Sequence, residues 1–219
     1  NFGKTDVGKK KRTMVEFASP NTNKPLHLGH LRNISIGESV SRILEFNGEK
    51  VIRASLNNDR GIHICKSMLA YQKFGKNKTP EKTKKKSDHF VGDFYVLFSK
   101  KAKTNESLET EAHEMLRKWE KGDEQTVALW KQMNKWALDG FKETYKKLNL
   151  QFDKEYYESE IYTQGKELIE NGLKKGFLTK EVDGAISINL DKEKLGKKYL
   201  MRSDGTSLYI TQDIYLALK

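Results

Sequence analysis

The sequence predicts an α/β protein built on a doubly wound parallel sheet, with a helical segment and β-hairpins inserted into it. Two short apolar runs rich in β-forming residues, 13–18 and 50–56, flank a stretch whose apolar residues recur at helical spacing. A long helical segment and then a second group of β-forming runs follow. Strand, helix and strand in this order and length indicate a crossover unit with parallel strands.

The first third of the chain therefore reads as half of such a sheet. After the first strand, a polar turn bounded by Pro20 and Pro25 leads into a helix that starts near His27 and ends near Gly48. The strand at 50–56 is followed by a second polar turn at 57–61 and by helical spacing over 62–74. This pattern is β-α-β-α.

The remainder combines a basic linker, helices and short strands. Residues 76–88 are Lys-rich, and residues 89–149 are helical, with a partly aromatic stripe that we interpret as core. The stripe consists of Val127, Trp130, Met133, Trp136, Phe141, Tyr145 and Leu148. Short strands are expected at 177–179, 185–190 and 207–210, separated by Asp183-Gly184 and Asp204-Gly205 turns. The expected domains are 1–75 (first half of the nucleotide-binding fold), 76–160 (basic linker and helices) and 161–219 (hairpins leading into the second half).

Composition limits the class of protein. With 36% hydrophobic and 32% charged residues, the 219-residue chain is expected to fold as a globular protein with a very polar surface. The formal charge of +11 favours a polyanionic partner, although six of the eleven residues from Lys76 to Lys86 are Lys, and such runs are usually solvated loops.

Other global features exclude some compartments. The single Cys65 excludes an internal disulfide and a Cys-rich zinc site, and no apolar stretch approaches the roughly 20 residues of a membrane span. We expect a cytoplasmic monomer that does not bind membranes. Because the chain starts without Met and stops within what reads as the first turns of a helix, we also expect a fragment.

Two histidines at the predicted helix start carry the chemistry. His27 and His30 lie three residues apart, on one face of the helix and beside backbone N–H groups that have no partner within it. A nucleotide phosphate placed there meets the positive end of the helix, and the imidazoles can donate hydrogen bonds as charge builds on phosphorus. Gly29 leaves room for an adenine base, and Lys24 precedes the helix.

The segment from Ser19 to Arg32 resembles the HIGH signature of class I aminoacyl-tRNA synthetases, in its arginyl form. The resemblance extends through 58–61, 152–153, 158–159 and 202–213. It implies a Rossmann-like catalytic core that activates L-arginine with ATP and Mg²⁺ and transfers it to tRNA(Arg), without a covalent enzyme intermediate. The second, Lys-rich signature of that class and its tRNA-binding domains lie outside the chain.

By this resemblance, His27, His30 and Lys24 are the catalytic residues. The ATP-binding set that it implies is Ser19, Pro20, Lys24, His27, Gly29 and His30. The arginine-binding set is Glu16, Asn21, Tyr209, Asp213 and Glu158. A guanidinium is planar with five donors and needs carboxylates and hydroxyls at fixed angles, which these side chains offer. Tyr209 and Asp213 are expected to lie across a strand-to-helix turn, and no metal-ligating residues are predicted.

One residue departs from the family, and two other functions stay open. Arg60 stands where the family usually has Trp, so the contact made by that aromatic side chain is not expected. A small nucleotidyltransferase would share the His-x-x-His arrangement but would not need the guanidinium acceptors, whereas a non-catalytic RNA-binding module would explain only the charge. The run from Gly3 to Lys10 imitates a P-loop, but it precedes the first strand and lacks the Ser or Thr that holds Mg²⁺.

Overall fold

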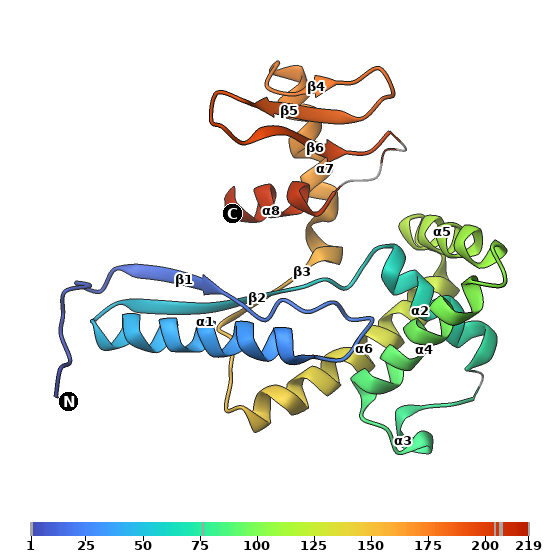
Figure 1. The fold of residues 1–219 in the computed structure, drawn as a ribbon, viewed down its shortest axis with the longest axis horizontal. Coiled ribbons are helices and arrows are strands. Elements are labelled where there is room, and N and C mark those ends of the chain that lie inside the picture. Colours follow the sequence, from blue (N-terminus) through green and yellow to red (C-terminus); the bar gives the residue numbers. More distant parts are fainter. Residues whose placement is uncertain (1, 76, 204, 206–207, 219) are drawn as a thin grey trace. The chain divides into compact units, whose positions relative to one another are not determined.

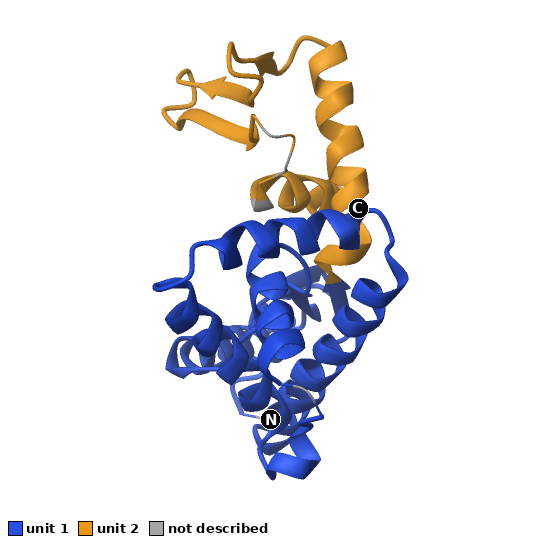
Figure 2. Ribbon diagram, turned by 90° about the vertical axis from the view of Figure 1, so that its right-hand side faces the viewer, with its two compact units in different colours: residues 1–156 blue, residues 157–219 orange. Residues whose placement is uncertain are grey.

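The chain forms two compact units, residues 1–156 and 157–219, in a computed structural model that describes residues 2–75, 77–203, 205 and 208–218. Figure 2 shows them in separate colours. Each unit is described by itself.

The first unit contains a three-stranded sheet in the order β1-β2-β3. Its strands are β1 (Arg12–Glu16), β2 (Lys50–Asn57) and β3 (Lys154–Tyr157). β1 and β2 pair in parallel, with Arg12 opposite Lys50 and Glu16 opposite Ala54, and helix α1 (Leu28–Phe46) connects them. Figure 1 shows α1 running back alongside the two strands. The predicted α/β crossover unit is therefore confirmed.

A glycine lets α1 approach the chain beyond β1. The buried residues of α1 are Ile34, Gly37 and Ser41, and a Cβ at Gly37 would overlap the ring of Phe17, which is itself buried. Ser41 donates a hydrogen bond from Oγ to the Gly37 carbonyl at 2.8 Å, so its buried hydroxyl is satisfied within the helix. Small residues thus define the packed face of α1.

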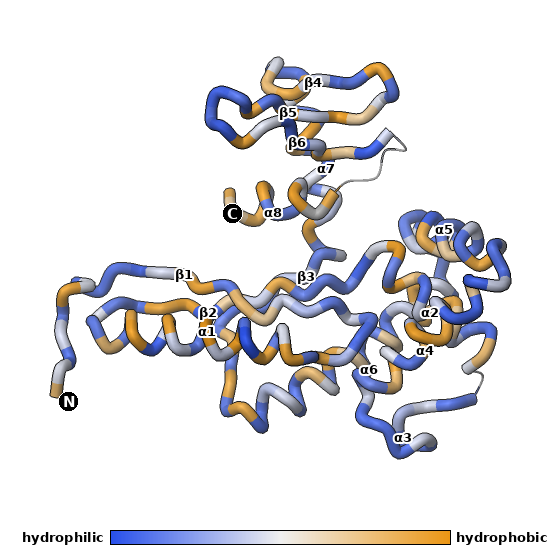
Figure 3. Tube along the Cα trace, viewed as in Figure 1, coloured by the Kyte–Doolittle hydropathy of each residue, from blue (hydrophilic) through white to orange (hydrophobic). Residues whose placement is uncertain are grey.

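A second face of α1 is apolar and exposed. Ile36 and Ile43 are 54% and 60% exposed, and Val40 lies between them on the same side of the helix. Figure 3 shows hydrophobic positions recurring along the whole of α1. The helical spacing was correctly predicted, but most of the apolar residues that define it do not enter the core of the first unit.

A cluster of helices completes the first unit. Its members are α2 (Ile62–Phe74), α3 (Pro80–Thr83), α4 (Ser87–Ala102), α5 (Ser107–Glu120) and α6 (Glu124–Lys147). The predicted stripe contributes to their core: Met133, Phe141 and Tyr145 are buried, and the ring of Trp136 lies 5.3 Å from that of Phe90. Within the Lys-rich segment, residues 80–83 form α3.

The second unit combines two helices with a small antiparallel sheet in the order β4-β5-β6. Its elements are α7 (Glu158–Lys174), β4 (Thr179–Lys180), β5 (Ile186–Leu190), β6 (Gly196–Met201) and α8 (Tyr209–Leu218). The strand predicted at 207–210 is wrong at Tyr209 and Ile210, which begin α8, while residue 207 lies outside the described part. The third strand is β6, where no strand was predicted.

Within the described residues, none of the helices is both long enough and apolar enough to cross a bilayer.

Candidate active site

The chain turns sharply where β1 ends. Ala18 and Ser19 both adopt the left-handed region, with φ of 66° and 43°, which costs a residue with a Cβ about 1–2 kcal/mol. Two side chains hold this turn: Asn33 of α1 accepts a hydrogen bond from the Ala18 N–H at 2.6 Å, and Ser55 of β2 accepts one from the Ser19 N–H at 3.3 Å. A left-handed turn thus leads the chain from β1 toward the helix that bears the histidines.

Two of the predicted site residues, Glu16 and Ser19, contact each other in this turn. The Ser19 hydroxyl donates to the Glu16 carboxylate and accepts a hydrogen bond from the Leu56 N–H at 3.1 Å. The Glu16 side chain is otherwise exposed to solvent. The turn therefore fixes a carboxylate at the carboxyl end of β1, where ligands of parallel α/β sheets commonly bind.

The next residues extend the pairing of the two strands. The buried Pro20 offers its carbonyl to the Asn58 N–H at 3.0 Å, and the Thr22 N–H donates to the Asn58 carbonyl at 3.1 Å. Asn21 and Asn58 form an isolated parallel bridge between these bonds. The loop with Pro20 and Asn21 is thereby joined to the loop that follows β2.

The two histidines cap α1 reciprocally. Nδ1 of His27, the N-cap residue, accepts from the Gly29 N–H at 3.1 Å, and Nδ1 of His30 accepts from the His27 N–H at 3.1 Å. A neutral imidazole that accepts at Nδ1 carries its proton on Nε2. Both rings, whose centroids lie 4.0 Å apart, therefore have an Nε2–H donor that the cap does not use.

Gly29 is required by the same arrangement. A Cβ at this position would lie 2.9 Å from Cε1 and 3.0 Å from Nδ1 of His27. Any other residue would push the His27 ring out of its capping position.

His30 is held in its neutral form. Burial, together with the neighbouring His27 and Lys24, lowers the pKa of His30 to about 4. At neutral pH the side chain is therefore an uncharged hydrogen-bond donor. Lys24 supplies the positive charge beside it.

We expect a histidine nitrogen titration by NMR to give His30 a pKa near 4 and the Nε2–H tautomer at neutral pH. Lys24→Met should raise this pKa because it removes a nearby positive charge, whereas Lys131→Met, which removes an exposed charge from α6, should leave it unchanged. The pKa lies below that of an unfolded histidine, so this group's contribution to folding stability should fall as pH drops from about 6.5 toward 4. A His30 pKa near 6.5 would contradict the assignment.

His63 and its partner Tyr95, which sequence reasoning missed, belong to the same region. The pKa of His63, on the first turn of α2, is lowered by burial and then by Lys66 and Lys24. Its Nδ1 lies 3.0 Å from the hydroxyl of Tyr95 on α4. His63 follows the second polar turn, as His27 follows the first, and this parallel could have identified it.

Arg60 is directed away from solvent, toward the end of α5. Its guanidinium forms an ion pair with Glu120 at 2.6 Å and lies 5.3 Å from the ring centroid of Trp119. The side chain is 7% exposed. Its positive charge is thus largely compensated by a carboxylate and an aromatic face.

The other predicted arginine-binding residues lie in the second unit. Glu158 is the first residue of α7, and Asp213 lies in α8, four residues after Tyr209. The expected strand-to-helix turn between Tyr209 and Asp213 is wrong, because a single helix contains both. The side chain of Tyr209 lies outside the described part of the structure.

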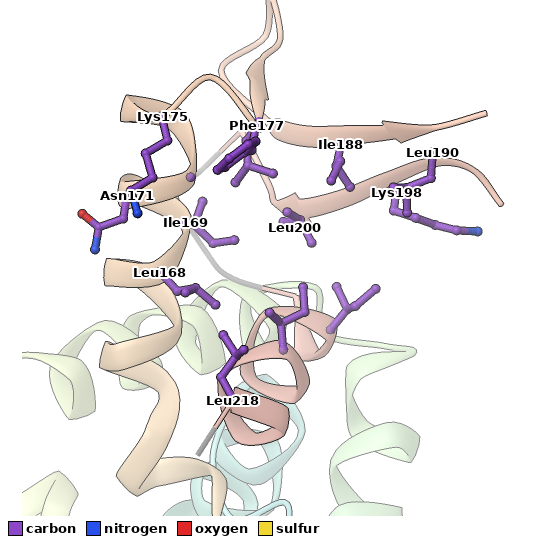
Figure 4. Close-up of a pocket in the computed structure, with 14 residues that line it drawn as sticks. Leu168, Ile169, Asn171, Lys175, Phe177, Ile188, Leu190, Lys198, Leu200 and Leu218 are labelled. Atoms are coloured by element: carbon purple, nitrogen blue, oxygen red, sulfur yellow. The ribbon is translucent and has the colours of Figure 1, made fainter. Parts of the chain in front are cut away.

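The second unit also contains an apolar pocket of about 390 Å³ between α7, the β5-β6 sheet and α8 (Figure 4). Leu168, Ile188 and Leu200 contribute to its lining, and none of its described lining residues is acidic. Such a pocket has no carboxylate among its described residues to pair with a guanidinium.

In the described part of the chain, no group of three or more His, Cys, Asp and Glu side chains could hold a metal ion.

Parallel strands joined by a helix, with imidazole donors at the start of that helix and a lysine shortly before it, form the arrangement typical of nucleotide-binding α/β proteins. A sequence profile described as "tRNA synthetases class I (R), catalytic domain" matches residues 1–219. The chain therefore belongs to the family of class I arginyl-tRNA synthetase catalytic domains.

Individual relatives agree with this assignment. The chain is 57% identical over 220 residues to the arginine–tRNA ligase of Treponema denticola, and the match covers all of this chain and 37% of that protein. It is 56% identical to that of Borrelia turicatae, over 97% of this chain and 38% of the relative. The solved Thermus thermophilus arginyl-tRNA synthetase superposes with a TM-score of 0.76 at 28% identity, covering 95% of this chain and 35% of that one. The chain thus spans less than two fifths of these proteins.

Proposed function

We propose that this chain carries the ATP-binding and arginine-binding core of an arginine–tRNA ligase. The observation that supports it best is the reciprocal His27–His30 cap, which leaves two Nε2–H donors at the N-terminus of α1. Family membership favours this function over a small nucleotidyltransferase or a non-catalytic RNA-binding module.

In this proposal, ATP lies against the start of α1. The two Nε2–H groups donate to oxygens of the α-phosphate, and the ammonium of Lys24 pairs with the phosphates that leave. Gly29 leaves space for the adenine, and Ser19 and Pro20 belong to the adjoining wall. Because His30 is neutral, it donates a hydrogen bond without adding a positive charge beside Lys24.

The proposed arginine-binding residues are the acceptors that the family resemblance assigns. Glu16 and Asn21 are assigned to its α-amino end, while Tyr209 and Asp213 are assigned to the guanidinium, with Glu158 as a further carboxylate. A guanidinium offers five N–H donors in one plane, so a carboxylate can accept two of them side by side.

The reaction that follows is adenylate formation. A carboxylate oxygen of arginine forms a bond to the α-phosphorus of ATP while the bond from phosphorus to the pyrophosphate oxygen breaks. The chain's residues position the reactants and stabilise negative charge on the α-phosphate. In the second step, a terminal ribose hydroxyl of tRNA(Arg) attacks the arginyl carbonyl and AMP leaves.

Mg²⁺ is proposed to enter with ATP as a substrate complex and to neutralise pyrophosphate charge. The proposed partners are tRNA(Arg), L-arginine and ATP, and the proposed state is a cytoplasmic monomer.

Calorimetric titration with a non-hydrolysable arginyl-adenylate analogue tests both halves of the site without turnover. We expect the protein as the cell makes it to bind this analogue at least about 100-fold more tightly than the lysyl and citrullyl analogues, because each of those leaves acceptors of the site unpaired.

Equal binding of all three analogues would indicate a generic adenylate site and would favour the nucleotidyltransferase. RNA binding without any analogue binding would favour the RNA-binding module.

A further inference from the structure

A buried asparagine of α6 contacts both loops that follow the parallel strands. Nδ2 of Asn134 donates to the Asp59 carbonyl at 3.1 Å, and Oδ1 of Asn134 accepts from the Thr22 hydroxyl. All three residues are buried, with Asn134 5%, Thr22 1% and Asp59 4% exposed. One amide thus joins the loop after β1 to the loop after β2.

A second side chain of α6 reinforces this link. Trp130, one turn before Asn134, donates from its indole N–H to the same Asp59 carbonyl at 2.6 Å. A carbonyl oxygen has two lone pairs, and here one helix supplies donors to both. The loops also bond directly to each other through Thr22 and Asn58. We call this set of contacts, formed by Thr22, Asp59, Trp130 and Asn134, the clamp. It is a closed hydrogen-bond network, in which each bond constrains the others.

The clamped loop leads directly to the residues assigned to ATP. Thr22 lies two residues before Lys24 and five before His27. Three residues after Thr22, α4 packs closely against the same loop, since a Cβ at Gly92 would lie 2.5 Å from Cδ of Pro25. The stretch from Thr22 to Pro25, which leads into His27, is thus contacted by both α6 and α4.

We infer that Asn134 is a positioning residue for the His27–His30 segment, and that α6 thereby sets the geometry of adenylate formation. The inference rests on the proposed function. Asn134 acts through Thr22 and Asp59, and not through ATP itself. A displacement of about 1 Å at reacting groups can lower a rate about 100-fold, so an indirect constraint of this kind can affect turnover strongly.

The test uses Asn134→Leu in the protein as the cell makes it, assayed by arginine-dependent pyrophosphate exchange with tRNA(Arg) present. Leu has a similar volume but forms neither hydrogen bond. We expect kcat to fall about 10- to 100-fold while the KM for ATP changes less than about threefold. The reason is that the variant misaligns the His27–His30 segment with the reacting groups but removes no residue assigned to ATP. Trp130→Phe, which removes the indole hydrogen bond and one ring of packing but keeps the Asn134 amide, should give a smaller loss of kcat.

Two controls separate positioning from stability. Met133→Ala removes a neighbouring side chain that is 2% exposed, so it should lower Tm while leaving kcat within about twofold. Thr22→Val combined with Asn134→Leu replaces both buried partners by apolar groups and should recover Tm, whereas kcat should stay low because the bond to Asp59 is still missing.

A second measurement does not depend on arginine activation. The imidazole nitrogen resonances of His27 and His30 should shift in Asn134→Leu and should stay in place in Met133→Ala. Absence of arginine-dependent exchange in the unmodified protein would refute the proposed function, and the resonances would still test the clamp. The inference is overturned if Asn134→Leu leaves those resonances unchanged, or if it leaves kcat within twofold of an active parent.

Discussion

Replacing His27 with Ala should lower the kcat of arginine-dependent pyrophosphate exchange by about 100- to 1000-fold, the cost of removing one fixed donor to a developing oxyanion. The Nε2–H of His27 is one of the two donors that the α1 cap leaves unused. Because the ring is exposed, its removal should not unfold the protein. The measurement is steady-state exchange, with circular dichroism to verify the helix content.

Two further variants separate the two roles of this ring. His27→Asn keeps a good N-cap residue but has no donor at the Nε2 position, so it should retain Tm and lose activity. His27→Gln places an amide N–H near that position and should recover part of the activity at some cost in Tm. If His27→Asn is as active as the unmodified protein, the ring serves only as a cap, and the proposed catalytic role is wrong.

The strand–helix–strand half of the fold could be predicted because its signals are local. The runs that became β1 and β2 are bounded by polar turns, and α1 begins one residue after His27, where Pro, Asn and Lys give way to helical spacing. Short-range patterns of this kind are decided by the backbone and by neighbouring residues, so tertiary structure did not overrule them.

The direction in which α1 faces could not be predicted in the same way. Hydrophobic spacing identifies a helix, but the packed side of α1 contains Gly37 and Ser41, while Ile36 and Ile43 are exposed. Close approach to Phe17 decided the orientation. A pattern that counts only apolar residues cannot detect a contact made possible by a missing side chain.

The start of α8 shows tertiary contacts overruling propensity. Tyr209, Ile210 and Thr211 are β-forming residues, and their sequence predicts the end of a strand and its turn. In the structure the Thr211 hydroxyl donates to the Leu200 carbonyl at 2.5 Å, and Thr211 packs against Gly165 of α7. Contacts with β6 and α7 thus hold these residues in a helix.

In the candidate site, too, local features could be predicted from the sequence and long-range contacts could not. The HIGH-like segment could be found because its residues are contiguous, and the chemistry of two imidazoles near a helix start follows from their types. The role of Asn134 could not be found, since it contacts Thr22 from 112 residues away. The tautomers of His27 and His30 likewise depend on hydrogen bonds that only the structure supplies.

The second large effect is expected from a substitution among the residues assigned to arginine. Asp213→Asn should raise the KM for arginine by about 30- to 1000-fold, because a guanidinium that loses one charged partner loses about 2–4 kcal/mol of binding. The KM for ATP should change little, since ATP is assigned to residues of α1 and the preceding loop. Discrimination between arginine and citrulline should also narrow, because the carboxylate that citrulline leaves unpaired is gone.

Glu167→Gln is the matched control for this variant. It removes one negative charge from an exposed position of α7 in the same unit, so it reports any general effect of charge on the KM for arginine. We expect that KM to stay within about twofold, because long-range effects between exposed charges are screened by salt. Equal shifts in Asp213→Asn and Glu167→Gln, or an unchanged KM in Asp213→Asn, would remove Asp213 from the guanidinium site and leave Tyr209 and Glu158 as its candidate acceptors.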